Sequence, residues 1–163
     1  MNGIRSESFI VVEYPQMQIV TGFYYRKVVE IASLTKIMTF YAVLTICREM
    51  NFDPEKERVQ IDAKAADISG TSAELYEGDW YTVLQLFYGL MLPSGNDAAT
   101  ALAKWGSSKL NDGSKGFINY MNRLAGEIGM KSSTFANPHG LPHSQNGSTA
   151  EDLSILIGKC LEH

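Results

Sequence analysis

The segment from residue 33 to residue 50, SLTKIMTFYAVLTICREM, contains neither Gly nor Pro and is apolar almost all round. An apolar stretch of this length without breakers predicts a buried helix rather than a surface helix. Ser33 suits its first position, because serine often caps a helix. Lys36 does not suit the first turn, where negative charge is favoured, and it has few polar neighbours. A local rule broken at one position indicates a functional task for that residue.

Ser33 and Lys36 form a Ser-x-x-Lys pair. Residues three apart on a helix share a face, so the hydroxyl and the amine are expected to reach each other. A lysine whose pKa is depressed by burial can take the serine proton and make the hydroxyl a nucleophile. The backbone N–H groups at the helix start can stabilise an oxyanion. The alternative is a capping serine beside a lysine that extends to the surface, because this spacing alone is common by chance.

A second candidate stretch is MLPSGNDAAT, at residues 91–100. Pro93 ends one predicted helix, and Asp97 begins the next. A functional turn here would use Ser94 to relay a proton and the Asn96 amide to hold a substrate carbonyl. The alternative is an ordinary helix-to-helix turn, for which Ser, Gly and Asn are the usual residues.

The rest of the chain is mostly helical after a two-stranded start, which predicts an α+β fold. A hairpin is predicted from residues 8–12 and 17–25, and a short strand at residues 59–61. Further helices are predicted at residues 82–92, 97–105, 114–128 and from 148 or 149 to 160. A lone hairpin is marginal in water, so we expect its sheet partners to lie beyond residue 160.

Composition narrows the classes of function. The net charge of -4, without a long basic stretch, argues against nucleic acid as a partner. No apolar run is long enough to span a bilayer, and the N-terminus lacks the pattern of a signal peptide. Cys47 and Cys160 do not form a disulfide framework. We interpret residues 161–163 as an expression-tag remnant.

Three motifs in order resemble the D-alanyl-D-alanine carboxypeptidases, the low-mass penicillin-binding enzymes: ASLTKIMT, MLPSGNDAA and FANPHGLP. The resemblance runs from about residue 9 to residue 160 and implies a β-lactamase/transpeptidase-like fold. It implies that Ser33 is the acylated nucleophile, Lys36 the general base, Ser94 a proton relay and Asn96 a substrate-binding residue. The N–H of Ser33 would be one oxyanion donor. The implied ligands are D-Ala-D-Ala stem peptides of peptidoglycan and β-lactams, with no metal or cofactor, in an extracytoplasmic location (periplasm or cell envelope).

The Lys-Thr-Gly motif of the family does not occur in the 163 residues. Its strand brings the second oxyanion donor and the group that holds the substrate carboxylate. We therefore expect residues 1–160 to be the N-terminal part of a catalytic domain that lacks its C-terminal sheet strands, with little or no activity. The exposed sheet edge would favour a homodimer, by strand pairing or swapping.

Three other functions are compatible with parts of this sequence. A class A β-lactamase would share Ser33 and Lys36, but the Glu-x-x-Leu-Asn stretch that it uses for deacylation is absent. A non-catalytic relative of the fold, binding cell-wall peptide or a protein partner, would not need either residue. His139 and His143 could form a zinc pair, but Gly140 and Pro142 between them favour a turn-forming loop in which His139 bonds to backbone.

Overall fold

The computed structural model describes residues 6–110 and 116–162. The elements are β1 (Phe9–Glu13), β2 (Gln18–Phe23), η1 (Ala32–Leu34), α1 (Thr35–Glu49), β3 (Arg58–Gln60), α2 (Ala63–Ala66), β4 (Trp80–Thr82), α3 (Val83–Met91), α4 (Asn96–Leu110), α5 (Gly116–Glu127) and α6 (Ala150–Leu161). The predicted α+β class is confirmed. The leader and tag predictions rest partly on residues 1–5 and 163, and the predicted start of the fifth helix rests on Ser114; all of these lie outside the described residues.

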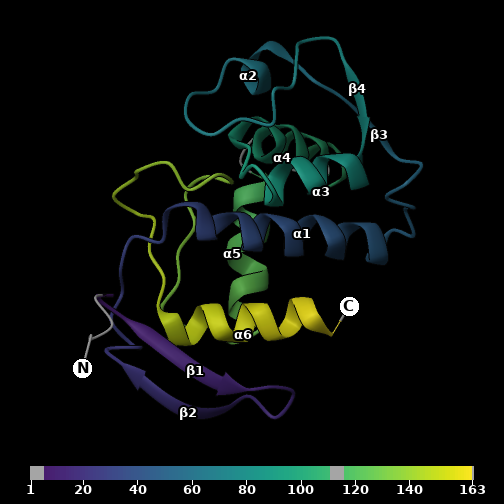
Figure 1. Ribbon diagram of the computed structural model, residues 1–163. Coiled ribbons are helices and arrows are strands. Elements are labelled where there is room, and N and C mark those ends of the chain that lie inside the picture. Colours follow the sequence, from purple (N-terminus) through teal and green to yellow (C-terminus); the bar gives the residue numbers. More distant parts are fainter. Residues whose placement is uncertain (1–5, 111–115, 163) are drawn as a thin grey trace.

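Helix α1 is the centre of the fold (Figure 1). It contacts α3 and α4 on one side and α6 on another, and α5 crosses it. Met38, Val43 and Ile46 on α1 are completely buried, which agrees with the apolar character of this segment. The prediction of a buried helix is confirmed, and residues of α1 thereby become the part of the chain most firmly held by packing.

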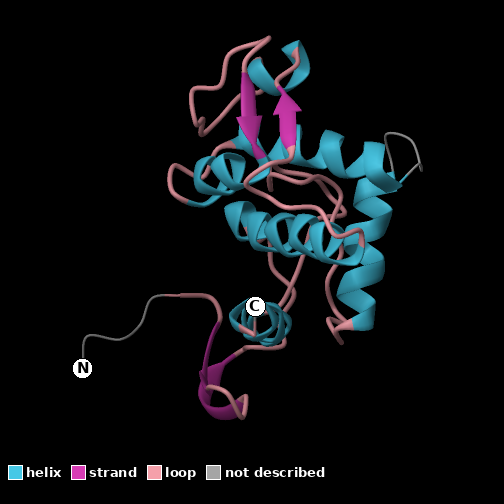
Figure 2. Cartoon of the chain, turned by 90° about the vertical axis from the view of Figure 1, so that its right-hand side faces the viewer, coloured by secondary structure: helices cyan, strands magenta, loops and turns pink. Residues whose placement is uncertain are grey.

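The hairpin β1–β2 is antiparallel, with Phe9 opposite Phe23 and a bulge between Val11 and Val12. It confirms the predicted pair of strands. In the described residues the sheet has these two strands only, and it packs through β1 against α6. Figure 2 shows it below α6, on the side away from the other helices. Its outer surface therefore keeps large apolar side chains in solvent, among them Val20 and Phe23.

A second small sheet joins β3 and β4, with Val59 opposite Tyr81. The sequence predicted the first of these strands, but it treated residues up to Trp80 as loop and missed both β4 and the short helix α2. Strand β4 ends where the capping box of α3 begins: Thr82 and Gln85 each accept a hydrogen bond from the other's backbone N–H. A strand of three residues is too short to show the alternation of apolar and polar residues, so the sequence did not predict β4.

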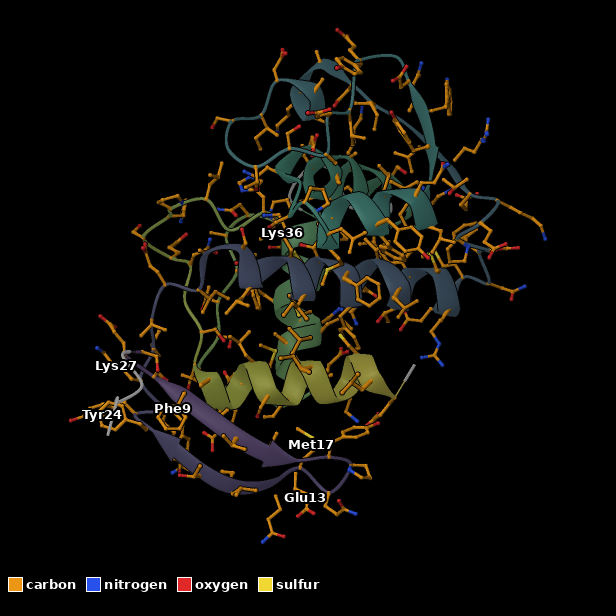
Figure 3. All side chains as sticks on the ribbon, in the orientation of Figure 1. Phe9, Glu13, Met17, Tyr24, Lys27 and Lys36 are labelled. Carbon is orange, nitrogen blue, oxygen red and sulfur yellow. The ribbon has the colours of Figure 1, made fainter. Side chains whose placement is uncertain are left out.

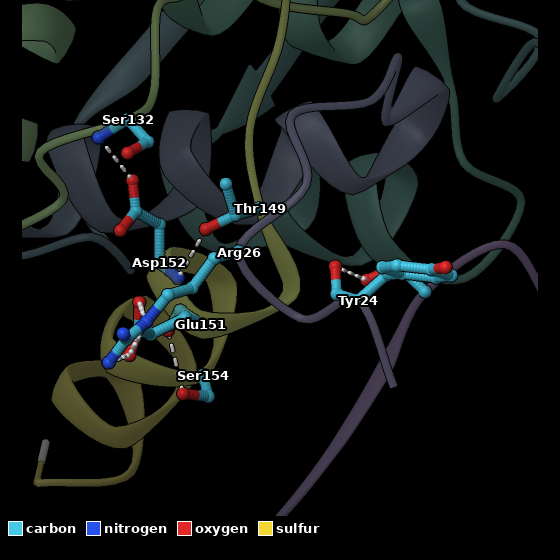
Figure 4. Close-up of polar contacts among 8 residues, drawn as sticks. Tyr24, Arg26, Ser132, Thr149, Glu151, Asp152 and Ser154 are labelled. Atoms are coloured by element: carbon cyan, nitrogen blue, oxygen red, sulfur yellow. Dashed lines mark hydrogen bonds and ion pairs between the residues drawn. The ribbon is translucent and has the colours of Figure 1, made fainter. Parts of the chain in front are cut away.

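The start of α6 ties the segment after the hairpin to the helices (Figure 4). Thr149, one of the two cap residues that the sequence offered, caps α6 by accepting a hydrogen bond from the N–H of Asp152 at 3.0 Å. The Asp152 carboxylate accepts from the N–H of Ser132 at 2.8 Å. Arg26 forms an ion pair with Glu151 at 3.0 Å. None of the helices in the described part of the chain is long and apolar enough to cross a membrane.

Candidate active site

Ser33 lies in the middle of the 3₁₀ turn η1, directly before α1. It is exposed, whereas Lys36 in the first turn of α1 is only 2% exposed. The prediction that Ser33 caps the helix is wrong: the cap position of α1 is Leu34, and no side chain caps it. The reason is that the Ser33 hydroxyl points to another partner, because Lys36 Nζ donates a hydrogen bond to Ser33 Oγ at 3.1 Å.

The Lys36 amine is held inside the protein rather than extended into solvent (Figure 3). It donates a second hydrogen bond, to the backbone carbonyl of His139 at 2.8 Å. Burial lowers the pKa of Lys36 to about 8, and the negative charge of Asp97 opposes part of that shift. With such a pKa, about a tenth of the lysine is neutral at pH 7. A neutral amine beside an accessible hydroxyl is the arrangement that a general base requires.

The loop that supplies the His139 carbonyl belongs to the third motif. Two contacts bond its histidines to backbone: His139 Nδ1 accepts from the N–H of Leu141, and His143 Nδ1 accepts from the N–H of Gln145, each at 3.2 Å. This confirms the turn interpretation of His139. Burial, followed by the charges of Lys36 and Lys64, lowers the pKa of His139 to about 4, so its ring is neutral at physiological pH. The sequence did not predict the contact with Lys36, because a backbone carbonyl carries no residue-type signal.

Ser94 lies in the turn between α3 and α4, and Asn96 is the first residue of α4. Ser94 has a left-handed backbone (φ 59), a costly conformation for a residue with a side chain, and its carbonyl accepts a short hydrogen bond from Thr71 Oγ1. Asn96 is buried, and its Nδ2 donates to the carbonyl of Ser69 at 2.8 Å. One of its two amide hydrogens therefore fixes the loop between α2 and β4.

The Asp97 side chain holds the same loop, between α2 and β4, against the start of α4. Its carboxylate accepts hydrogen bonds from Ser72 Oγ at 2.7 Å and from the N–H groups of Ala73 and Leu75 at 2.9 and 3.2 Å. These donors stabilise a negative charge that is only 1% exposed. The turn predicted to be functional is thus held by many hydrogen bonds, and the role of Asp97 in organising it was not predicted from the sequence.

The structure brings the predicted residues together to different degrees. Ser33 and Lys36 are in direct contact. Helix α4 packs against α1, and the Asp97 charge at its start acts on Lys36. Within residues 6–110 and 116–162, no hydrogen bond joins Ser94 or Asn96 to Ser33 or Lys36.

Comparison with known proteins gives a consistent result. The family model described as D-alanyl-D-alanine carboxypeptidase matches residues 1–163. The chain is 33% identical over 158 residues to D-alanyl-D-alanine carboxypeptidase DacD of Escherichia coli, covering 94% of this chain and 40% of that protein. It is 31% identical over 132 residues to DacF of Bacillus subtilis, covering 81% of this chain and 33% of that protein. The chain thus spans well under half the length of these two relatives.

Solved structures agree in fold. The D-alanyl-D-alanine carboxypeptidase DacD from Francisella tularensis has a TM-score of 0.89 at 30% identity, covering 98% of this chain and 37% of that one. Penicillin binding protein 6B from Escherichia coli has a TM-score of 0.89 at 29% identity, covering 98% of this chain and 51% of that one. With the Ser33–Lys36 contact in place and a family match along its length, the chain belongs to the D-alanyl-D-alanine carboxypeptidase family.

Proposed function

We propose that the protein is a serine-type D-Ala-D-Ala carboxypeptidase that acts on peptidoglycan stem peptides through an acyl-enzyme on Ser33. The observation that carries this proposal is the hydrogen bond of 3.1 Å between Lys36 Nζ and Ser33 Oγ, made by a lysine that is 2% exposed. Family membership supports the same reaction. β-Lactams would acylate the same serine, because they present a strained amide to the same nucleophile.

In the first step, neutral Lys36 accepts the proton of the Ser33 hydroxyl while Oγ attacks the carbonyl carbon between the two D-Ala residues. The Oγ–C bond forms, and the charge on the carbonyl oxygen is stabilised in part by the N–H of Ser33. The C–N bond then breaks, and the terminal D-Ala leaves after its nitrogen takes a proton from Lys36 through Ser94. Water hydrolyses the ester and restores Ser33.

Asn96 is proposed to bind the backbone of the substrate. Its Nδ2 donates to Ser69, and the amide group still has a second hydrogen and an acceptor oxygen to offer. The left-handed conformation of Ser94 supports its role as a relay, because strained backbone conformations cluster at functional sites, where a side chain must be aimed. No step of this reaction requires a metal or an organic cofactor.

Four further points remain proposals. Residues 1–160 would be one partial catalytic domain, followed by a tag remnant at residues 161–163. No Lys-Thr-Gly motif occurs in the 163 residues, and we expect these residues alone to react about two to three orders of magnitude more slowly, the typical effect of losing one oxyanion donor. A homodimer through the β1–β2 edge and a location in the periplasm or cell envelope are proposed on the exposed hairpin and on the family, respectively.

The test is covalent labelling with a fluorescent penicillin, followed by digestion and mass spectrometry. We expect a slow adduct on Ser33 that disappears in Ser33→Ala. Ser144→Ala removes an exposed serine of the neighbouring loop and serves as the matched control. The E. coli DacD relative sets the reference rate, and the incubation is made long enough to detect labelling a thousandfold slower.

Each outcome separates the alternatives. A stable adduct that needs Ser33 supports the carboxypeptidase. An adduct that forms and is lost within seconds indicates a β-lactamase. No adduct within the long incubation contradicts the proposal and favours a non-catalytic relative of the fold.

A further inference from the structure

The loop of residues 137–141 is fastened to α1 at two places beyond Ser33. Lys36 Nζ donates to the carbonyl of His139 at 2.8 Å, and Thr39 Oγ1 donates to the carbonyl of Pro138 at 2.6 Å. Thr39 is completely buried. Because Lys36 and Thr39 are three apart on the helix, they grip adjacent carbonyls of the loop from one face of α1.

The loop is also braced internally. Asn137 Oδ1 accepts from the N–H of Gly140 at 2.7 Å, and Asn137 Nδ2 donates to the carbonyl of Leu141 at 2.9 Å. The two bonds close a ring around His139. The direction of the His139 carbonyl is therefore set by Asn137 together with the His139 ring, which accepts from the N–H of Leu141.

A close backbone contact locks the loop against the turn that carries Ser33. Gly140 has φ +83, and a Cβ at this position would lie 1.9 Å from the carbonyl oxygen of Ala32. Ala32 itself is left-handed, with φ 44. Two unusual backbone conformations thus meet directly beside the nucleophile, and such conformations persist only where the surroundings enforce them.

The hydrogen bond from Lys36 to the His139 carbonyl can orient the amine for its role as a base. A neutral amine has two N–H bonds and one lone pair. A carbonyl can only accept, so His139 engages an N–H in either protonation state. The protonated amine donates to Ser33 Oγ, whereas the neutral amine can turn its lone pair to accept from the Ser33 hydroxyl. A carboxylate in the same place would raise the pKa of the amine, whereas a neutral carbonyl orients it without adding charge. The titratable group whose charge acts on Lys36 is Asp97 on α4. The charges of Lys36 and Lys64 in turn help burial to lower the pKa of the His139 ring, which is the titratable group of the loop.

We propose that residues 137–141 are a positioning element for the general base, in which Asn137 and Thr39 fix the His139 carbonyl so that the lone pair of Lys36 faces Ser33. Asn137 and Thr39 are positioning residues, because they act through Lys36. The inference rests on the proposed function, since it gives Lys36 the role of base.

The test compares Asn137→Ala and Thr39→Val with two controls. Thr39→Ser keeps the hydroxyl that donates to Pro138, and Asn119→Ala removes an exposed amide on α5. Two quantities are measured in each: the rate of penicillin adduct formation across pH, and the titration midpoint of the Lys36 ε-carbon by NMR. Circular dichroism and thermal unfolding verify that each variant is folded.

In Asn137→Ala and Thr39→Val we expect adduct formation at pH 7 to fall about tenfold to a hundredfold, because misplacement by about 1 Å carries costs of that order. The Lys36 midpoint should rise as the loosened loop admits water, which moves the rate profile to higher pH. Thr39→Ser should restore both values, and Asn119→Ala should leave them unchanged.

Folded Asn137→Ala and Thr39→Val variants with wild-type rates and midpoints would overturn the inference. If instead the wild-type chain forms no adduct, the proposed function fails, and the Lys36 midpoint in the variants still decides whether the loop positions the amine. If one variant does not fold, the other supplies the result.

Discussion

The helices around α1 and the hairpin β1–β2 differ in how they bury their apolar side chains. Met38 on α1 and Leu102 on α4 are completely buried, whereas Val20 on β2 is 63% exposed. The Ser33–Lys36 pair and the 137–141 loop that holds it belong to the first region. The hairpin is covered on one side by α6. The base Lys36 is therefore buried among the helices, with the exposed Ser33 at the edge of this region, whereas the hairpin leaves large apolar side chains in solvent.

The largest expected effect is loss of core packing. Leu102→Ala should lower the free energy of unfolding by about 2–5 kcal/mol, because it leaves a cavity between α4 and its neighbours. Val20→Ala in the hairpin should change it by less than about 0.5 kcal/mol, because the side chain is already in solvent. Chemical denaturation of both variants measures the two losses in free energy of unfolding. Equal losses would contradict the difference in packing between the helices and the hairpin.

The next effect concerns Lys36. Its pKa in the folded state is about 8, against 10.5 for the ordinary lysine. The unfolded chain therefore binds more protons between these values, and stability rises as pH increases from 8 to 10.5. The full penalty, about 3 kcal/mol, applies below pH 8.

Lys36→Met should thus stabilise the fold at pH 7 by about 1–3 kcal/mol, after the lost hydrogen bonds are taken into account, and should abolish acylation. The gain should fade as pH approaches 10.5. Exposed Lys131→Met is the control and should show no such trend. A Lys36→Met variant that is less stable than wild type at every pH would argue against a destabilising buried amine.

A smaller effect tests how α6 connects the two regions. Thr149→Ala removes the cap of α6 and should cost about 1 kcal/mol, whereas Thr149→Ser keeps the accepting oxygen and should cost little. Because the hairpin packs on α6, hydrogen exchange should accelerate in both elements and not in α1. Acceleration confined to α1 would show that the regions are divided differently.

The smallest effect on stability tests the proposed homodimer. Val20→Lys should change the free energy of unfolding by less than about 0.5 kcal/mol. It should nevertheless reduce self-association, because a charge on an edge strand opposes pairing. Sedimentation at several concentrations measures this, with Gln16→Lys in the exposed turn as the control. A wild-type chain whose mass is that of a monomer at all concentrations would contradict the dimer.

Long elements and side-chain chemistry could be predicted from the sequence. The uninterrupted apolar run predicted α1, Thr82 predicted the cap of α3, and the cap of α6 was narrowed to Ser148 or Thr149, because these signals are local. The Ser33–Lys36 contact followed from helical spacing. Where the prediction failed, a different local contact prevailed: Ser33 bonds to Lys36 one turn along instead of capping α1.

The rest of the site depends on backbone contacts that residue types do not encode. The His139 carbonyl reaches Lys36 across more than a hundred residues of sequence, and Gly140 fits against Ala32 because it lacks a side chain. The network around Asp97 likewise consists mainly of backbone N–H donors. Only coordinates reveal such partners.

The most direct measurement is the titration of Lys36 in the wild-type chain, followed by NMR of its ε-carbon. If a dry environment makes this amine a base for Ser33, its midpoint should lie at about 8. A midpoint at or above 10.5 would show a hydrated, permanently charged lysine and would contradict the proposed activation of the serine.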